Sequence, residues 1–215
     1  MASSVNYWET VYKTRAAEEA ASGHYVGFGE LASLHYSLRS SQPYIAFPTN
    51  HALLLWLSDL ASTNNMTIQI HMEATTASVT ELEALLAHNT ATKIVWDHAG
   101  WTNSGVMTAG TAAQLLGSHS NLYLTLKLRN PDSDALESGH PLDSAGVLKS
   151  DWQSLISSYS NRIMLGSDLK YWEAAYTPAA LLEAISTLNT TLLDQLSASD
   201  ASNLRTGTAQ LVYGM

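Results

Sequence analysis

Residues 66–73 read MTIQIHME, a short segment in which apolar and polar side chains alternate. Side chains of a β-strand alternate between the two faces of a sheet, so its isoleucines share one face while Thr67, Gln69 and His71 share the other. Residues 122–127, LYLTLK, show the same alternation. A parallel sheet covered by helices on both faces has nearly continuous apolar strands. The alternation therefore favours a barrel, in which one face packs on helices and the other lines a partly polar interior.

Three further segments also predict strands, because they combine apolar residues with turn signals at their ends. They cover residues 24–30 (HYVGFGE), 93–98 (KIVWDH) and 162–168 (RIMLGSD). Segments with helical spacing cover residues 4–21, 51–61, 80–88, 108–116, 150–158, 179–188 and 200–212. A capping-box pattern at Thr80 and Glu83 sets the predicted start of the third helix. Strands that alternate with helices indicate a parallel sheet, so we predict one α/β domain over residues 1–215. We expect it to be of the (β/α)8 TIM-barrel type and to form a partial barrel of five βα units, the C-terminal portion of a barrel.

Composition and charge exclude several classes of protein. The chain has 215 residues, of which 46% are hydrophobic and 13% charged, which is typical of a folded protein. It has no cysteine, which excludes disulfides, a thiolate nucleophile and a cysteine-ligated metal. The net charge of −9 argues against a nucleic-acid partner. No apolar run approaches a membrane span and residues 1–10 lack the features of a signal peptide, so we expect no membrane partner and a cytoplasmic location.

Ionisable side chains stand at the end of all five predicted strands: Glu30, His71, His98, Lys127 and Asp168. Ligands of parallel α/β folds bind beyond the carboxyl ends of the strands. Because these ends meet at one mouth of a barrel, we expect the five side chains to converge there. Each one alone also has a structural interpretation, as a hydrogen-bonded histidine, a turn-capping aspartate or a carboxylate paired with a nearby cation.

Four short motifs together resemble a known family. GFGE ends at Glu30, IQIHME contains His71, WDHAG contains His98 and LGSD ends at Asp168. Their order, spacing and placement at strand ends resemble the metal-dependent amidohydrolase superfamily, most closely its amidohydrolase-2 branch, over residues 23–215. The resemblance implies a hydrolase that cleaves an amide, lactone or related carbonyl bond of a small molecule with metal-activated water. A metal-dependent decarboxylase of the same superfamily is an alternative.

The resemblance also implies roles for these residues. His71 and Asp168 would bind a divalent metal ion, and Asp168 would also handle the proton of the attacking water. His98 would be a metal ligand or a catalytic acid and base, and Glu30 a further ligand. Imidazole and carboxylate ligands suit zinc, which we expect first, and also manganese, iron or cobalt.

The sequence departs from the superfamily pattern at the N-terminal side. It contains no His-x-His pair, which supplies two metal ligands after the first strand of family members, and strands one to three have no counterpart. An alternative prediction is therefore an incomplete, catalytically inactive fragment of a barrel. Its exposed strand edges would promote association into a homo-oligomer.

Residues beyond the strand ends are candidates for substrate binding. Lys127 and Arg129 could hold a carboxylate of the substrate, and Trp101 could wall the pocket. Surface ion pairs and aromatic core packing are the competing interpretations.

Residues 31–50 and 128–149 are long segments without a helix or strand pattern, and we expect them to be loops at the mouth. His35 and His140 lie in these segments and are expected to be solvated loop histidines.

Overall fold

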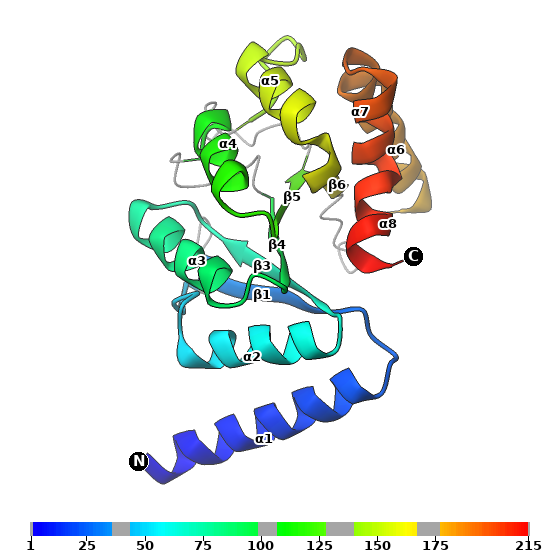
Figure 1. The fold of residues 1–215 in the computed structure, drawn as a ribbon. Helices are drawn as coiled ribbons and strands as arrows, with labels where there is room; N and C mark the ends of the chain where they lie inside the picture. The colour runs from blue at the N-terminus through cyan, green and yellow to red at the C-terminus, as the bar shows by residue number, and fades with distance from the viewer. Residues whose placement is uncertain (1, 36–43, 99–106, 128–139, 167–176, 215) are drawn as a thin grey trace.

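The computed structural model of the chain describes residues 2–35, 44–98, 107–127, 140–166 and 177–214 (Figure 1). Its centre is a six-stranded sheet in the order β2-β1-β3-β4-β5-β6. The strands are β1 (Gly27–His35), β2 (Ile45–Ala46), β3 (Thr67–Met72), β4 (Lys93–Asp97), β5 (Leu122–Lys127) and β6 (Ile163–Gly166). All neighbouring pairs are parallel except β1 and β2, which are antiparallel.

The sheet is open within the described residues. The two edge strands are β2 and β6, and no pairing between them closes a ring. The predicted α/β class and partial-barrel type are thus confirmed, with the five parallel strands β1, β3, β4, β5 and β6 paired side by side in chain order. The short β2 is the strand that the sequence did not predict.

Helices cover the apolar face of this sheet, and further helices lie on its other side. They are α1 (Ala2–Ala21), α2 (Ala52–Thr63), α3 (Thr76–His88), α4 (Ala109–Ser118), α5 (Ser150–Tyr159), α6 (Pro178–Thr191), α7 (Ala198–Ser202) and α8 (Thr208–Tyr213). The main core joins α2–α5 to the apolar strand residues, including Ile68 and Ile70, whose side chains are fully buried as their alternation predicted. No helix among the described residues is long and apolar enough to cross a membrane.

The other face of the sheet is partly covered by α8, which lies across the sheet from α3 and α4 (Figure 1). Val212 packs there with Val95 and Tyr123 in a second apolar cluster. The Thr67 hydroxyl donates to the Val212 carbonyl at 3.2 Å, and the Lys93 ammonium donates to the Leu211 and Val212 carbonyls at 3.1 Å. A cation at the C-terminal end of a helix stabilises its last carbonyls. Helix α8 therefore covers part of the polar face of the strands.

Two helix predictions need correction. The third helix begins at Thr76, because Thr75 and Ser78 form the capping box, and the Thr80 hydroxyl instead donates back to the Thr76 carbonyl within the helix. The predicted helix over residues 200–212 is divided into α7, a π-helical turn at Asn203–Gly207, and α8. Both Thr75 and Thr80 are residues that can cap a helix, and the structure uses Thr75.

The expectation that residues 31–50 form a loop is wrong at both of its ends. β1 continues to His35, and β2 pairs with it through Leu34 and Ala46. The Phe47 N–H donates to the Ser33 carbonyl, and the Ser33 hydroxyl donates to the Phe47 carbonyl, both at 2.6 Å. His35 is therefore a strand residue and not a solvated loop histidine.

The expectation for His140 is also wrong. Its side chain is buried, with 7% of the residue exposed, and its Nδ1 lies 3.0 Å from the Leu142 carbonyl and 3.2 Å from the Leu142 amide nitrogen. An isolated bridge between Leu142 and Leu148 further organises this part of the predicted loop.

Candidate metal centre

Three side chains from different strands meet near the carboxyl ends of β3 and β4. His71 is the penultimate residue of β3 and His98 follows β4, whereas Glu30 lies within β1, which continues beyond its predicted end to His35. The Glu30 Oε1 lies 2.9 Å from the His71 Nδ1 and 3.3 Å from the His98 Nε2. The potential ligand atoms of the three residues all lie within 4.8 Å of one another. Atoms bonded to one tetrahedral ion at about 2.0–2.2 Å lie roughly 3.3 Å apart. The three groups therefore have the chemistry and the spacing that a divalent ion requires.

Two glycines of β1 allow Glu30 to reach this position. A Cβ atom at Gly27 would lie 2.7 Å from the Thr67 carbonyl oxygen, and one at Gly29 would lie 2.5 Å from the Gln69 Cβ. Such distances are far shorter than van der Waals contact, so only glycine permits this approach of β1 to β3. The register between the two strands shifts between Phe28 and Leu31, and Glu30 lies within that irregular step.

His98 follows β4 in a left-handed backbone conformation, with φ at 58°. Few non-glycine residues adopt this conformation unless their surroundings stabilise it. The Thr125 hydroxyl accepts the His98 backbone N–H at 2.9 Å and donates to the Asp97 Oδ1 at 3.1 Å. One hydroxyl of β5 thus fixes the chain where the imidazole turns toward Glu30.

Electrostatics favour an ionised Glu30. Hydrogen bonds from His71 and then His98 hold the pKa of the Glu30 carboxyl well below its usual range. The neighbouring Asp97 differs, because burial raises its pKa to about 6, opposed mainly by the charge of His98. Two carboxylates with separated pKa values are typical of functional sites.

Solvent reaches this group of residues. The exposed fractions of the side chains are 41% for Glu30, 22% for His71 and 15% for His98. A hydrolytic metal site needs an open position for water besides about three protein ligands. The partial exposure is consistent with such a position.

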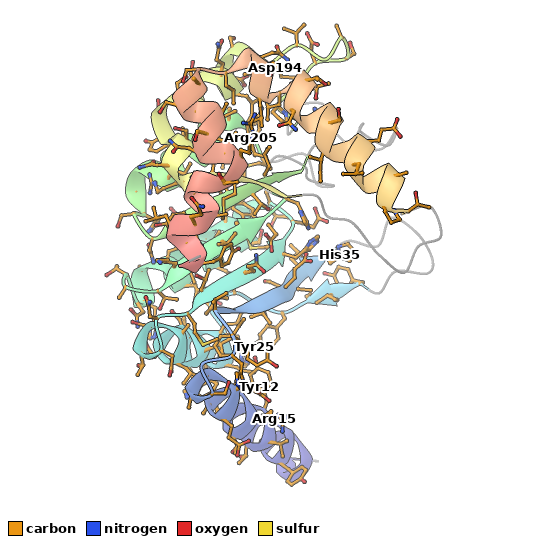
Figure 2. All side chains as sticks on the ribbon, turned by 90° about the vertical axis from the view of Figure 1, so that its right-hand side faces the viewer. Tyr12, Arg15, Tyr25, His35, Asp194 and Arg205 are labelled. Atoms are coloured by element: carbon orange, nitrogen blue, oxygen red, sulfur yellow. The ribbon has the colours of Figure 1, made fainter. Side chains whose placement is uncertain are left out.

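A second set of ligand atoms adjoins the first and shares His71. The His71 Nε2 lies 3.0 Å from the His35 Nδ1 and 4.0 Å from the Glu73 Oε1, and the last two atoms are 3.7 Å apart. His35 lies at the carboxyl end of β1, whereas Tyr25 precedes the other end of that strand (Figure 2). Glu73 was not among the predicted site residues, although it lies two residues after His71 and therefore continues the alternation of β3.

Helix α8 contacts the polar face of the sheet next to these residues. The Gln69 side-chain amide donates to the Tyr213 hydroxyl, and Gln69 shares a strand face with His71. Burial, and then the charge of Asp97, raise the pKa of Tyr213. Helix α8 therefore covers part of the polar face of the sheet beside the candidate site.

The structure describes no side chain for the remaining predicted site residues. Lys127 ends β5 in register with Gly166, and its backbone is described but its side chain is not. Asp168, Trp101 and Arg129 lie outside the described residues. Their predicted roles, like those of the three clustered residues, stay predictions.

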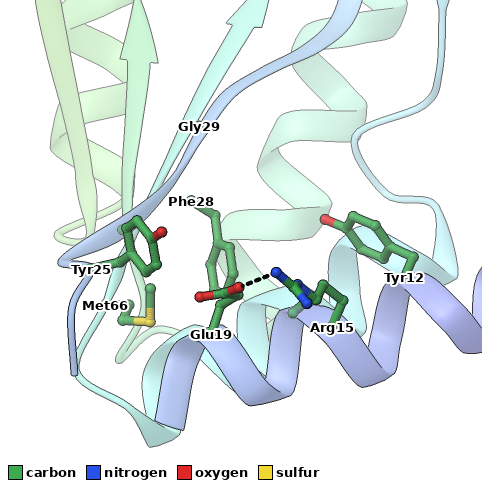
Figure 3. A pocket seen from close by; sticks show the side chains of 9 residues that line it. Tyr12, Arg15, Glu19, Tyr25, Phe28, Gly29 and Met66 are labelled. Carbon is green, nitrogen blue, oxygen red and sulfur yellow. Dashed lines mark ion pairs between the residues drawn. The ribbon is translucent and has the colours of Figure 1, made fainter. Parts of the chain in front are cut away.

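A groove of about 290 Å³ lies at the opposite end of β1, between that strand and α1 (Figure 3). It is lined mainly by apolar and aromatic groups, among them Tyr12, Tyr25 and Phe28. An ion pair of 2.9 Å between Arg15 and Glu19 lies along it. None of Glu30, His71 and His98 lines this groove, and Figure 2 shows Tyr12, Arg15 and Tyr25 well apart from His35.

No family model and no curated protein matches this sequence. The structure is similar to a dihydroorotase from Campylobacter jejuni, with a TM-score of 0.54, 19% identity, and coverage of 94% of this chain and 61% of that one. It also aligns with a zinc-bound amidohydrolase from Burkholderia multivorans (TM-score 0.46, 19% identity, 78% and 59% coverage). A manganese-bound dihydroxybenzoic acid decarboxylase from Polaromonas sp. JS666 aligns with a TM-score of 0.43, 12% identity, and 85% and 59% coverage.

The comparison with the dihydroorotase supports the fold. The likeness to the dihydroorotase shows that the chain has the TIM-barrel type of fold that the amidohydrolase resemblance implied. The chain spans 61% of the length of the dihydroorotase, and 59% of each of the two other structures.

Proposed function

We propose that this chain is a metal-dependent hydrolase of the amidohydrolase type, in which Glu30, His71 and His98 hold a divalent metal ion. The observation that carries the proposal is the approach of two imidazoles to one carboxylate oxygen, at 2.9 and 3.3 Å, on neighbouring parallel strands. The set is mixed nitrogen and oxygen, which suits zinc or manganese.

A divalent ion bound there would lower the pKa of a bound water and polarise a carbonyl group of the substrate. Glu30 contributes a carboxylate that is already ionised, because the histidines lower its pKa. Thr125 and Asp97 keep the backbone of His98 in its unusual conformation. In the proposed reaction Asp168 takes the proton of the attacking water.

The proposed substrate is a small molecule with an amide, lactone or related carbonyl bond and a carboxylate. Lys127 and Arg129 would bind the carboxylate, because Lys127 is the last residue of β5 and Arg129 comes two residues later in the sequence. Trp101 would form an apolar wall of the same pocket. Lys127→Met and Arg129→Met should therefore raise KM for carboxylated substrates more than they lower kcat.

Metal content and thermal stability test the proposal. Purified protein should retain zinc or manganese, and a chelator should lower its Tm. His98→Asn should remove the ion from this set, while His24→Asn, at an exposed position in the turn before β1, serves as the matched control. A folded wild-type protein that retains no ion and whose Tm is indifferent to added zinc and manganese would contradict the proposal.

A further inference from the structure

The two ring nitrogens of His71 face two different groups of side chains. Nδ1 lies 2.9 Å from the Glu30 carboxylate, and Nε2 lies 3.0 Å from the His35 Nδ1. The His71 ring therefore stands between the proposed metal ligands on one side and the pair His35 and Glu73 on the other. We infer that His35, His71 and Glu73 form a second divalent-metal site, which shares the His71 imidazole with the first.

The spacing of the second set fits one ion. Its three potential ligand atoms are separated by 3.0, 3.7 and 4.0 Å, and these distances bracket the value of roughly 3.3 Å for ligands of a tetrahedral ion. The composition, two imidazole nitrogens and one carboxylate oxygen, is the same as that of the first set. The two sets therefore offer a metal ion the same kinds of ligand atom.

The burial of Glu73 supports a cation at this place. Its side chain is only 4% exposed, and its Oε1 faces both imidazoles. Removing a carboxylate from water costs several kcal/mol unless a positive charge lies nearby. His35 and His71 are 21% and 22% exposed, so a hydrated ion can reach the group from solvent.

The backbone fixes the two added ligands in place. His35 is held between two strands, since β1 pairs with β2 at His35 and Ile45 and with β3 on its other side. The Glu73 N–H donates to the Leu34 carbonyl at 2.9 Å, which ties the end of β3 to the end of β1. Ligands carried on paired strands keep their spacing better than ligands on loops.

Sharing His71 has a defined chemical requirement. A neutral imidazole has one nitrogen with a lone pair and one N–H, so coordination through both nitrogens requires loss of that proton to solvent. The resulting negative charge, together with those of Glu30 and Glu73, offsets three of the four positive charges of two divalent ions. The site inferred here rests on the proposed function only through this shared ring.

Equilibrium dialysis with zinc, and separately with manganese, followed by elemental analysis tests the inference. Wild-type protein should bind two ions per chain. His35→Asn and Glu73→Gln should each bind one ion, and His98→Asn should also bind one, but from the other set. His71→Asn should bind neither tightly, because both ions use its ring. Circular dichroism confirms that each variant is folded, and His24→Asn should behave as wild type.

The outcomes separate the two proposals. One ion in wild type that is lost in His98→Asn and kept in His35→Asn would overturn the second site, leaving His35 and Glu73 as groups that orient His71. One ion that is kept in His98→Asn and lost in His35→Asn would instead contradict the proposed first site. Two ions that persist in both His35→Asn and Glu73→Gln would place the second ion elsewhere and overturn the inference.

Discussion

The hydroxyl group of Thr125 sets the chain conformation at His98. It is a hydrogen-bond acceptor for the His98 backbone and a donor to Asp97, and the residue is buried on the polar face of β5. The Thr125 side chain of β5 thus positions Asp97, the last residue of the neighbouring strand β4, and His98, which follows it. The backbone conformation of His98 at the candidate site therefore depends on this contact.

Thr125→Val should destabilise the protein by about 1–3 kcal/mol, because it leaves a buried N–H and a buried carboxyl without their partner at nearly unchanged volume. Metal affinity should fall about 10–100-fold, as is typical when groups behind the ligands are removed. Urea unfolding and zinc titration measure the two effects. Thr125→Ser should restore most of both, and Thr63→Val, at an exposed helix position, is the control. Equal zinc affinity in Thr125→Val and wild type would show that the hydroxyl does not position His98.

At the scale of elements, α2 and α3 are joined by a small polar cluster at the surface. The Asp59 carboxylate of α2 lies 3.0 Å from the His88 Nε2 and accepts from the Asn89 side-chain amide at 2.9 Å. The hydrogen bonds from Asn89 and then His88 lower the pKa of Asp59. The cluster therefore links the C-terminal end of α3 to the middle of α2.

This lowered pKa predicts a pH dependence. A carboxyl group whose folded-state pKa lies below its unfolded value stabilises the fold fully above that unfolded value, 3.8 here, and loses the effect as the pH falls through the folded value. Wild type should therefore exceed Asp59→Asn in stability by less than about 1 kcal/mol near neutral pH, because the group is exposed and screened. Urea unfolding between about pH 5 and pH 2 should show the difference vanish. A difference that grew toward acid would contradict the assigned direction.

Lys93 connects β4 to the C-terminal end of α8. Lys93→Met removes the donor to the Leu211 and Val212 carbonyls, so we expect a loss of about 1 kcal/mol. Amide hydrogen exchange should increase over residues 208–213, and little elsewhere, because this end of the helix loses its anchor. Lys13→Met removes an exposed ion pair with Glu9 on α1 and is the matched control, with a smaller expected effect. Unchanged exchange over residues 208–213 would show that the apolar cluster alone holds α8.

At the scale of the whole molecule, the sheet has open edges. Only the end of β1 is covered by β2, through Leu34 and His35, and β6 is the other edge strand among the described residues. Unpaired strand edges are templates for association between chains. We therefore propose that copies of this chain associate through these edges.

A lysine placed at the edge should weaken this association. Val26 precedes β1 and is 54% exposed, so Val26→Lys adds charge beside the open edge with little cost to the core. Size-exclusion chromatography with light scattering, over a concentration series, should show an oligomer for wild type and a shift toward monomer for this variant. Leu182→Lys on the exposed face of α6 is the control and should leave the mass unchanged. A wild-type monomer at all concentrations would contradict edge association.

The sequence predicted the parallel strands, the helices between them, and the positions of His71 and His98 near strand ends. These features depend on periodicity and turn residues, which are local properties of the chain. It could not determine that His35 and Glu73 join His71, or that α8 covers part of the polar face of the sheet. Those contacts join residues 36 to 145 positions apart, and only strand pairing and packing bring such residues together. Local patterns therefore predict which residues can bind an ion, while the tertiary structure decides which of them share one.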